Sequence, residues 1–265
     1  MHQEYSSVPS LPERLVDIDA AAMPVIGFAT DYSRGHFIER HSHNKGQLIY
    51  AVQGVMVVAS DAGQWVVPPT RGIWMPAGFV HSIRCVGDVH MRSLWVRPDA
   101  APQLPAESQA VGVSPLLREL ILAAMNVGRS SYTADSRNGR LMGLVLDELQ
   151  ALPVLPLHLP QPLDPRLQRI CSRLMEQPDD DSTLERWGQV LSVDVKTLQR
   201  RFASETGMTF GQWRQQARLL RGLELLAGGE KVINVALALG YASPSAFATM
   251  FKRQFGQTPS EFFQA

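Results

Sequence analysis

Residues 231–256 read KVINVALALGYASPSAFATMFKRQFG: an apolar helical stretch, a turn and a second helical stretch that ends at glycine. Ser243 and Pro244 suit the N-cap and the first position of that second helix. Phe247 and Phe251 are four residues apart, so they share one face of it. The pattern predicts a helix that packs one face inside and leaves the other free to contact a partner.

The same layout occurs earlier in the chain, at residues 184–207, which read LERWGQVLSVDVKTLQRRFASETG. Its inward pair is Leu198 and Phe202, and Gly207 stands where a C-cap glycine is expected. Each stretch therefore has the layout of a helix-turn-helix unit. Ordinary packed helices of an all-α domain remain the alternative for either unit taken alone.

Two further signals concern how the first unit begins and how far apart the units lie. Ser182, with Glu185 three residues later, predicts a capping box at the start of the first unit. A helix of roughly 19 residues is expected between the units, and it spans about 28 Å. Such a spacer would place two recognition helices in successive major grooves of DNA, about 34 Å apart.

The composition fits a folded protein with more than one domain. The 265 residues are 45% hydrophobic and 19% charged, enough for two modest cores. The first residues hold no apolar run after a basic start, and no stretch approaches the roughly 18 apolar residues of a membrane span. The chain has two cysteines, Cys85 and Cys171, which disfavours a disulfide framework. We therefore expect a cytoplasmic protein with no membrane partner.

The formal net charge is zero, but the charges are unevenly placed. Residues 1–163 hold 12 basic and 14 acidic side chains, whereas residues 164–265 hold 13 and 11. Between 195 and 223 there are six basic residues and one acidic residue, Glu205. Local fields decide contact with a polyanion, so this asymmetry favours DNA as a partner of the C-terminal half.

The remaining pattern predicts an α+β multidomain chain. Short strands rich in Val, Ile and aromatic residues, with turn signals at Gln53-Gly54, Ser60–Gly63 and Gly87-Asp88, predict a β-barrel or sandwich. After these strands come apolar residues at helical spacing, and then five prolines between 153 and 165. The expected parts are a barrel over 1–110, a helical hairpin over 111–152 broken near 128–132, an extended proline-rich linker over 153–163 and an all-α domain over 164–265.

The C-terminal residues carry a family resemblance. ALALGYASPSAFATMFKRQFGQTPSEFF (236–263) resembles the signature end of the AraC/XylS transcription regulators. RRFASETGMTFGQWRQQARLLRGLELL (200–226) is similar to their first recognition helix and connecting helix. The resemblance covers roughly 164–263. It implies double-stranded DNA as a partner, read by recognition helices at about 194–205 and 244–255.

The resemblance also implies individual DNA contacts. Positions that reach base edges in family members are matched here by Lys196, Gln199 and Arg200, with Gln199 suited to adenine and Arg200 to guanine. In the second helix the matching positions include Ser245 and Thr249, which are short readers. Lys252 and Arg253 are expected to contact phosphates.

The N-terminal half resembles a cupin, a double-stranded β-helix barrel. Residues 35–54 match its first motif at Gly35, His41, His43 and Gly54, with Gln47 where glutamate is usual. The second motif is represented by Pro76-Ala77-Gly78 and then His81, although its opening glycine is displaced.

The histidines leave two interpretations open. His41 and His43 are two residues apart on a predicted strand, so their side chains point to the same face. Both can therefore enter the barrel and meet His81. Three imidazoles suit zinc, nickel, copper or iron, and the Gln47 oxygen is a weaker fourth ligand than a carboxylate. Alternatively, these side chains are polar groups that bind one another or an organic effector without a metal.

Together the two resemblances imply a transcription regulator, with activation as the family habit and RNA polymerase as a partner. The barrel would sense a small-molecule or metal effector, and the hairpin would form a homodimer. The candidate dimer contact is an apolar face at Leu116, Leu120, Leu141 and Leu144, which can equally pack on the barrel. We expect no enzymatic activity; the alternative is a metal-dependent cupin enzyme.

Overall fold

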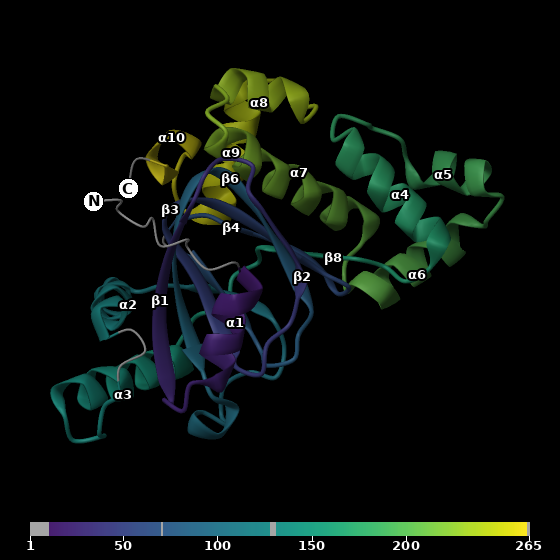
Figure 1. Cartoon of the computed structure of the whole chain (residues 1–265). Coiled ribbons are helices and arrows are strands. Elements are labelled where there is room, and N and C mark those ends of the chain that lie inside the picture. Colours follow the sequence, from purple (N-terminus) through teal and green to yellow (C-terminus); the bar gives the residue numbers. More distant parts are fainter. Residues whose placement is uncertain (1–10, 70, 128–130, 264–265) are drawn as a thin grey trace, which may run out of the picture.

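The computed structural model of the chain describes residues 11–69, 71–127 and 131–263 (Figure 1). A curled β-sheet forms the N-terminal part, a helical hairpin lies beside it, and a group of helices forms the C-terminal part. Every helix among the described residues is too short or too polar to cross a membrane. The expected α+β architecture, with a barrel followed by an all-α domain, is confirmed.

The sheet is antiparallel, and its long strands form the centre. The strand order is β1-β6-β3-β4-β8, with β2 paired to β6 and with β5 paired to both β3 and β7. The strands are β1 (Val25–Tyr32), β2 (Phe37–His41), β3 (Gly46–Ser60), β4 (Gly63–Val67), β5 (Arg71–Met75), β6 (His81–Val96), β7 (Gln109–Gly112) and β8 (His158–Pro160). A 3-10 turn, η1 (Pro98–Ala100), follows β6.

Two of the expected turns are not chain reversals. β3 and β6 continue through Gln53-Gly54 and Gly87-Asp88, and the β3–β6 register shifts between Ala51 and Val55. Gly54 has a φ of 82°, and a Cβ there would lie 2.2 Å from the Asp88 carbonyl oxygen. Glycine thus permits the irregular pairing at which these long strands bend. The turn prediction was wrong because a bulge and a turn use the same residue types.

Helices α2 (Pro115–Val127) and α3 (Arg137–Gln150) form the expected hairpin. Residues 128–130 of the predicted break lie outside the described residues. The hairpin buries Leu117, Ile121 and Val145 in one cluster with Leu48 of the barrel. The expected boundary at 110/111 falls inside β7, because residues 111 and 112 pair with β5 and continue the sheet.

The segment 153–163 is extended, as expected, but it is not a free spacer. Its strand β8 pairs with β4, with Gln64 opposite Leu159. Val154 forms a bridge to Val111 of β7. The backbone groups of the segment therefore join the barrel sheet, and the C-terminal domain starts from the barrel surface.

The C-terminal helices confirm both helix-turn-helix units, α5–α6 and α8–α9, with α7 between them (Figure 1). The bounds are α4 (Pro165–Glu176), α5 (Leu184–Leu191), α6 (Val195–Thr206), α7 (Phe210–Ala227), α8 (Val232–Ala238), α9 (Pro244–Phe255) and α10 (Pro259–Phe262). The prediction of Ser182 as a cap is wrong by one residue. Thr183 accepts the hydrogen bond from the Arg186 N–H, because the side chain of Ser182, like its N–H, is bound to the Asp180 carboxylate.

Candidate functional site

The first recognition helix, α6, is closed at both ends by the residues that its sequence supplies. The Asp194 carboxylate accepts a hydrogen bond from the Thr197 N–H, and Gly207 caps the C-terminus with a φ of 69°. Leu198 and Phe202 are buried, as predicted. The opposite face of the helix is therefore left at the surface.

The second recognition helix, α9, repeats this construction. Ser243 accepts the Ala246 N–H, Pro244 follows it, and Gly256 ends the helix at a φ of 76°. Phe247 and Phe251 are fully buried. The connecting helix α7 has 18 residues, which is close to the expected length and spans about 27 Å.

The structure places the predicted DNA contacts on the outward faces of these two helices. All of them are exposed: Lys196, Gln199, Arg200, Ser245, Thr249, Lys252 and Arg253. The four basic side chains among them form no ion pair with another described residue. Their charge is therefore available to an external polyanion.

Other arginines of the domain are used internally. Arg201 pairs with the buried Asp164 at 2.7 Å, and Arg221 pairs with the buried Glu224 at 3.0 Å. Arg214 and Arg218 donate to backbone carbonyls in the α4–α5 region. The sequence indicated a basic segment, but the tertiary contacts decide which of its charges face outward.

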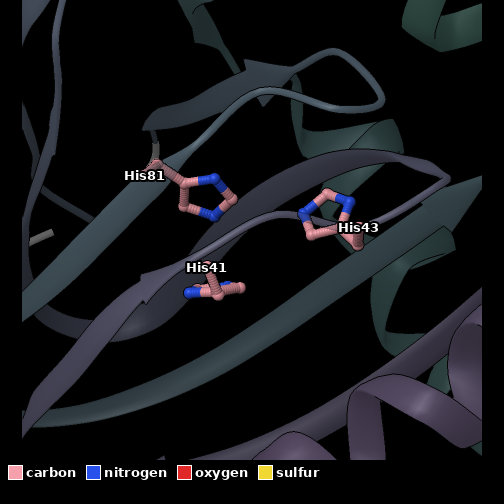
Figure 2. A group of neighbouring side chains, drawn as sticks. All are labelled: His41, His43 and His81. Atoms are coloured by element: carbon pink, nitrogen blue, oxygen red, sulfur yellow. The ribbon is translucent and has the colours of Figure 1, made fainter.

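The second site lies in the barrel, where His41, His43 and His81 come together (Figure 2). Figure 2 shows the three rings turned toward one another. Their ligand atoms all lie within 4.8 Å of one another. His43 and His81 are buried, at 4% and 0% exposure. The predicted convergence of the three histidines is therefore present.

Strand alternation does not explain this convergence. β2 ends at His41, which is directly opposite His81 in the β2–β6 pair. His43 lies in the turn before β3 rather than in a strand. The ring of His43 reaches the site because its Nδ1 contacts the carbonyl oxygen of Lys45, which is held in the same turn.

Backbone contacts orient each imidazole in the same way. The Nδ1 atoms of His41 and His81 contact the carbonyl oxygens of Glu39 at 2.8 Å and Phe79 at 3.0 Å. Nδ1 must donate in each case, because a carbonyl oxygen only accepts, and so in the neutral ring Nε2 carries the lone pair. Among the described residues, the buried Nε2 of His81 has no hydrogen-bond partner.

The surroundings favour neutral rings. Burial lowers the pKa of His43, and it lowers the pKa of His81 to about 3, with the neighbouring histidines adding to the effect. A neutral imidazole with a free Nε2 is the form that binds a metal ion.

Gln47 completes the polar end of the site. Its Oε1 lies 3.2 Å from His43 Nε2, and its Nε2 donates to the Ser93 hydroxyl at 3.0 Å. Two acceptors face each other if His43 is protonated on Nδ1. A cation between them, or a turned amide, would satisfy both atoms.

The residues present fit a divalent metal. Zinc–nitrogen bonds of about 2.0–2.1 Å at tetrahedral angles place ligand nitrogens about 3.4 Å apart. The histidine nitrogens lie within 4.8 Å, so side-chain rotations of about 1 Å would close the site. The orphaned Nε2 of His81 supports the same assignment.

A mostly apolar pocket adjoins His41 and Gln47. It is lined by Ile18, Phe28, Thr30, Tyr32, Ile38, His41, Gln47, Ile83, Met91, Ser93 and Trp95. Of the aromatic residues here, Trp95 lies on β6. The others lie on β1 beside β6, and that pairing joins segments about 60 residues apart, so no local pattern reveals it.

Helix α1 (Leu11–Ala20) covers this pocket and was missed from the sequence. Ile18 is 1% exposed, and Asp19 accepts hydrogen bonds from the Asn44 N–H and, through its carbonyl, from Lys45 Nζ. The turn that positions His43 is thus also attached to α1. The spacing of Leu11, Leu15 and Ile18 was the signal available in the sequence.

Comparisons with known proteins match both halves of the chain. A profile described as AraC-like ligand binding domain matches residues 24–191, and one described as Helix-turn-helix domain matches residues 187–265. The chain belongs to the AraC family of transcription regulators, with an N-terminal ligand-binding barrel and a C-terminal DNA-binding domain.

Two relatives and one solved structure are similar to the chain. The HTH-type transcriptional regulator NimR of Escherichia coli K12 is 35% identical over 222 residues, which are 84% of this chain and 81% of NimR. RipA of Corynebacterium diphtheriae is 33% identical over 107 residues, 40% of this chain and 31% of RipA. The solved structure of ToxT from Vibrio cholerae covers 91% of this chain and 98% of its own, at 13% identity and a TM-score of 0.39.

Proposed function

We propose that this regulator reads DNA with α6 and α9 and responds to an effector held at the histidine end of the barrel pocket. The observation that carries the proposal is the division of each recognition helix into a buried apolar face and an exposed polar face. Homodimerisation, contact with RNA polymerase and action in the cytoplasm, where bacterial DNA lies, belong to the same proposal.

DNA reading is tested by selecting duplexes from a random pool with the full chain. The dissociation constant of the selected duplex is then measured against salt. Phosphate contacts release counterions, so the logarithm of affinity should fall with a slope of about −0.9 for each phosphate neutralised. Failure to enrich any sequence, or binding that does not change with salt, would contradict the proposal.

For the barrel, we propose that His41, His43 and His81 hold a divalent transition metal such as zinc, nickel, copper or iron, with Gln47 as a weak fourth ligand. When bound, the ion would act as a Lewis acid that attracts an oxygen or nitrogen atom of an effector. The apolar wall beside it would hold the effector body. The neutral rings and the shared Nδ1 contacts support this assignment.

The metal content of the purified protein tests the proposed metal site directly. Protein purified without an affinity tag should carry close to one equivalent of metal by mass spectrometry, and the His41→Ala/His43→Ala variant should carry almost none. His36→Ala, which removes an exposed imidazole, is the matched control and should retain the metal. If the parent and both variants are all metal-free, the histidines are polar groups of a pocket for an organic effector.

The relatives named above are transcriptional regulators, which supports a role without catalysis. A cupin enzyme would instead show turnover that survives deletion of residues 164–265. Loss of all DNA binding on that deletion, without any turnover in the remaining barrel, is the result expected here.

A further inference from the structure

Strand β6 presents the barrel pocket on one face and the DNA-binding domain on the other. Ile83 lines the pocket, and the buried His81 lies against the pocket residue His41, whereas the side chain of Arg84 is exposed on the other face of the strand. Successive side chains of a strand alternate, so this difference follows from the register. Arg84 lies only three residues, about 10 Å, from the metal-site candidate His81.

The outward face of β6 carries an ion pair to the DNA-binding domain. Arg84 Nη2 lies 2.8 Å from the Oε2 atom of Glu224 in α7. The Glu224 side chain is 6% exposed, and the Arg84 side chain is 46% exposed. Arg221, one turn earlier in α7, shares the same carboxylate oxygen. Glu224 therefore keeps a counterion even when Arg84 leaves.

The C-terminal end of α7 makes a second contact with the barrel. Arg34, in the turn between β1 and β2, donates to the Gly228 carbonyl oxygen at 3.3 Å. Gly87 of β6 lies against the same end, since a Cβ there would be 3.6 Å from the Ala227 carbonyl oxygen. A cation at a helix C-terminus is favoured by the unpaired carbonyls. The end of α7 is thus contacted by the β1–β2 turn and by strand β6.

The interface is not fully closed beside the ion pair. A cavity of about 140 Å³ adjoins it, lined by both arginines, Glu224 and Gln64 together with apolar side chains of β8, α4 and α7. Water can therefore reach the guanidinium groups. Arg84 is half-exposed, and the buried Glu224 carboxylate keeps Arg221 as a counterion, so the Arg84–Glu224 pair can open without unfolding either domain.

We propose that Arg84 and Glu224 form a releasable latch between the barrel and α7, and that β6 transmits a change at the pocket to it. Since α7 connects the two helix-turn-helix units, the latch sets how both recognition helices are presented to DNA. The latch itself rests only on the interface, whereas its regulatory role rests on the proposed function.

Hydrogen exchange of the full chain tests the latch without any effector. In Arg84→Ala, backbone amides of residues 221–228 should exchange up to about fivefold faster, which corresponds to about 1 kcal/mol at 1.36 kcal/mol per factor of ten. Arg40→Ala removes the exposed Arg40–Asp61 pair, which lies within the barrel, and should leave these amides unchanged. Equal exchange in the parent and Arg84→Ala would overturn the latch.

Transmission through β6 is tested by perturbing the pocket side. Ile83→Val trims one methyl group next to Arg84, and His81→Leu removes the orphaned imidazole. Each should change exchange at residues 221–228 in the parent, and this change should disappear in the Arg84→Ala background. A change that is the same in both backgrounds, or absent from both, would overturn transmission through the pair.

The regulatory role has its own readout. Arg84→Ala should alter affinity for the selected duplex at least about threefold, while Arg40→Ala should not. Faster exchange in Arg84→Ala with unchanged DNA affinity would refute the regulatory role and leave the latch standing. A chain that selects no DNA would refute the proposed function instead, and the exchange result would still decide the latch.

Discussion

Arg200 and Arg201 are neighbours in α6, yet their guanidinium groups have different surroundings. Arg201 is bound to Asp164, which also caps α4 and pairs with Arg166. Arg200 is exposed and forms no ion pair with another described residue. Two identical side chains thus have a structural role and a proposed DNA-reading role, and their position around the helix decides which.

Arg200→Ala should weaken binding to the selected duplex by about 1–3 kcal/mol and relax the preference at one base pair. Lys252→Ala, by contrast, should weaken binding equally on all sequences and reduce the salt slope by about 1. Competition assays over single-base variants of the duplex distinguish the two patterns. Arg137→Ala, which removes an exposed charge from the hairpin, is the control. If Arg200→Ala weakened binding equally on every duplex variant, the proposed base contact of Arg200 would be contradicted.

The Arg166 hydrogen bond, with help from Arg201, holds the pKa of Asp164 well below its usual value of about 3.9. A lowered carboxyl pKa stabilises the fold above that usual value, and the contribution is lost as the pH falls below it. Asp164→Asn keeps a capping oxygen but loses the charge. In calorimetric scans at pH 7, the unfolding transition of the C-terminal domain should shift down by on the order of 4–8 °C, the shift that a loss of about 1 kcal/mol causes in a domain of about 100 residues. The difference should narrow below about pH 4. A pH-independent difference would contradict the ion-pair account.

Among the secondary-structure elements, the helix ends matter most, because the cap residues fix where each recognition helix begins and ends. Ser243→Ala should destabilise the second unit by about 1 kcal/mol, since the Ala246 N–H loses its acceptor. Ser243→Gly should cost only a few tenths of a kcal/mol. Denaturant titrations of both variants measure this contrast. Equal losses would indicate that the hydroxyl group does not act as a cap.

The strands show where local signals are ambiguous. Gln53-Gly54 and Gly87-Asp88 satisfy the requirements of a turn, but β3 and β6 pair along most of their length and pass through both. The pairing partner of a strand is remote in sequence, so register, bulge and continuity depend on the whole sheet.

In the whole molecule, the hairpin exposes the apolar residues that the proposed homodimer would use. Leu116 and Leu144 are 50% and 41% exposed. Leu120 and Leu141 are half-buried against the hairpin and barrel core, so this part of the predicted dimer face also packs internally. A contact between subunits would therefore remove the most apolar surface from water at Leu116 and Leu144.

Leu116→Asp/Leu144→Asp should therefore convert a dimer to a monomer in sedimentation velocity at micromolar concentration. Ile233→Asp/Leu237→Asp places the same charges at exposed apolar positions of α8 and should leave the dimer intact. A parent chain that sediments as a monomer would refute the dimer proposal.

Some features could be predicted from the sequence because their causes are local. The i,i+4 pairs Phe247–Phe251 and Leu198–Phe202, the cap residues and the C-cap glycines act within one or two helical turns. They define both helix-turn-helix units and the outward faces of the recognition helices. The three histidines that meet in the barrel were identified differently, by the resemblance to the two cupin motifs.

Only the tertiary structure decided the remaining features, because they depend on segments that are far apart in the chain. It decided that Arg201 and Arg221 are held by buried carboxylates while Arg200 stays exposed. It placed His43 in a turn beside α1, added β8 to the barrel sheet, and brought Arg84 to Glu224. Each of these contacts joins groups whose meeting depends on the packing of complete elements, and such packing leaves no periodic or local pattern in the sequence.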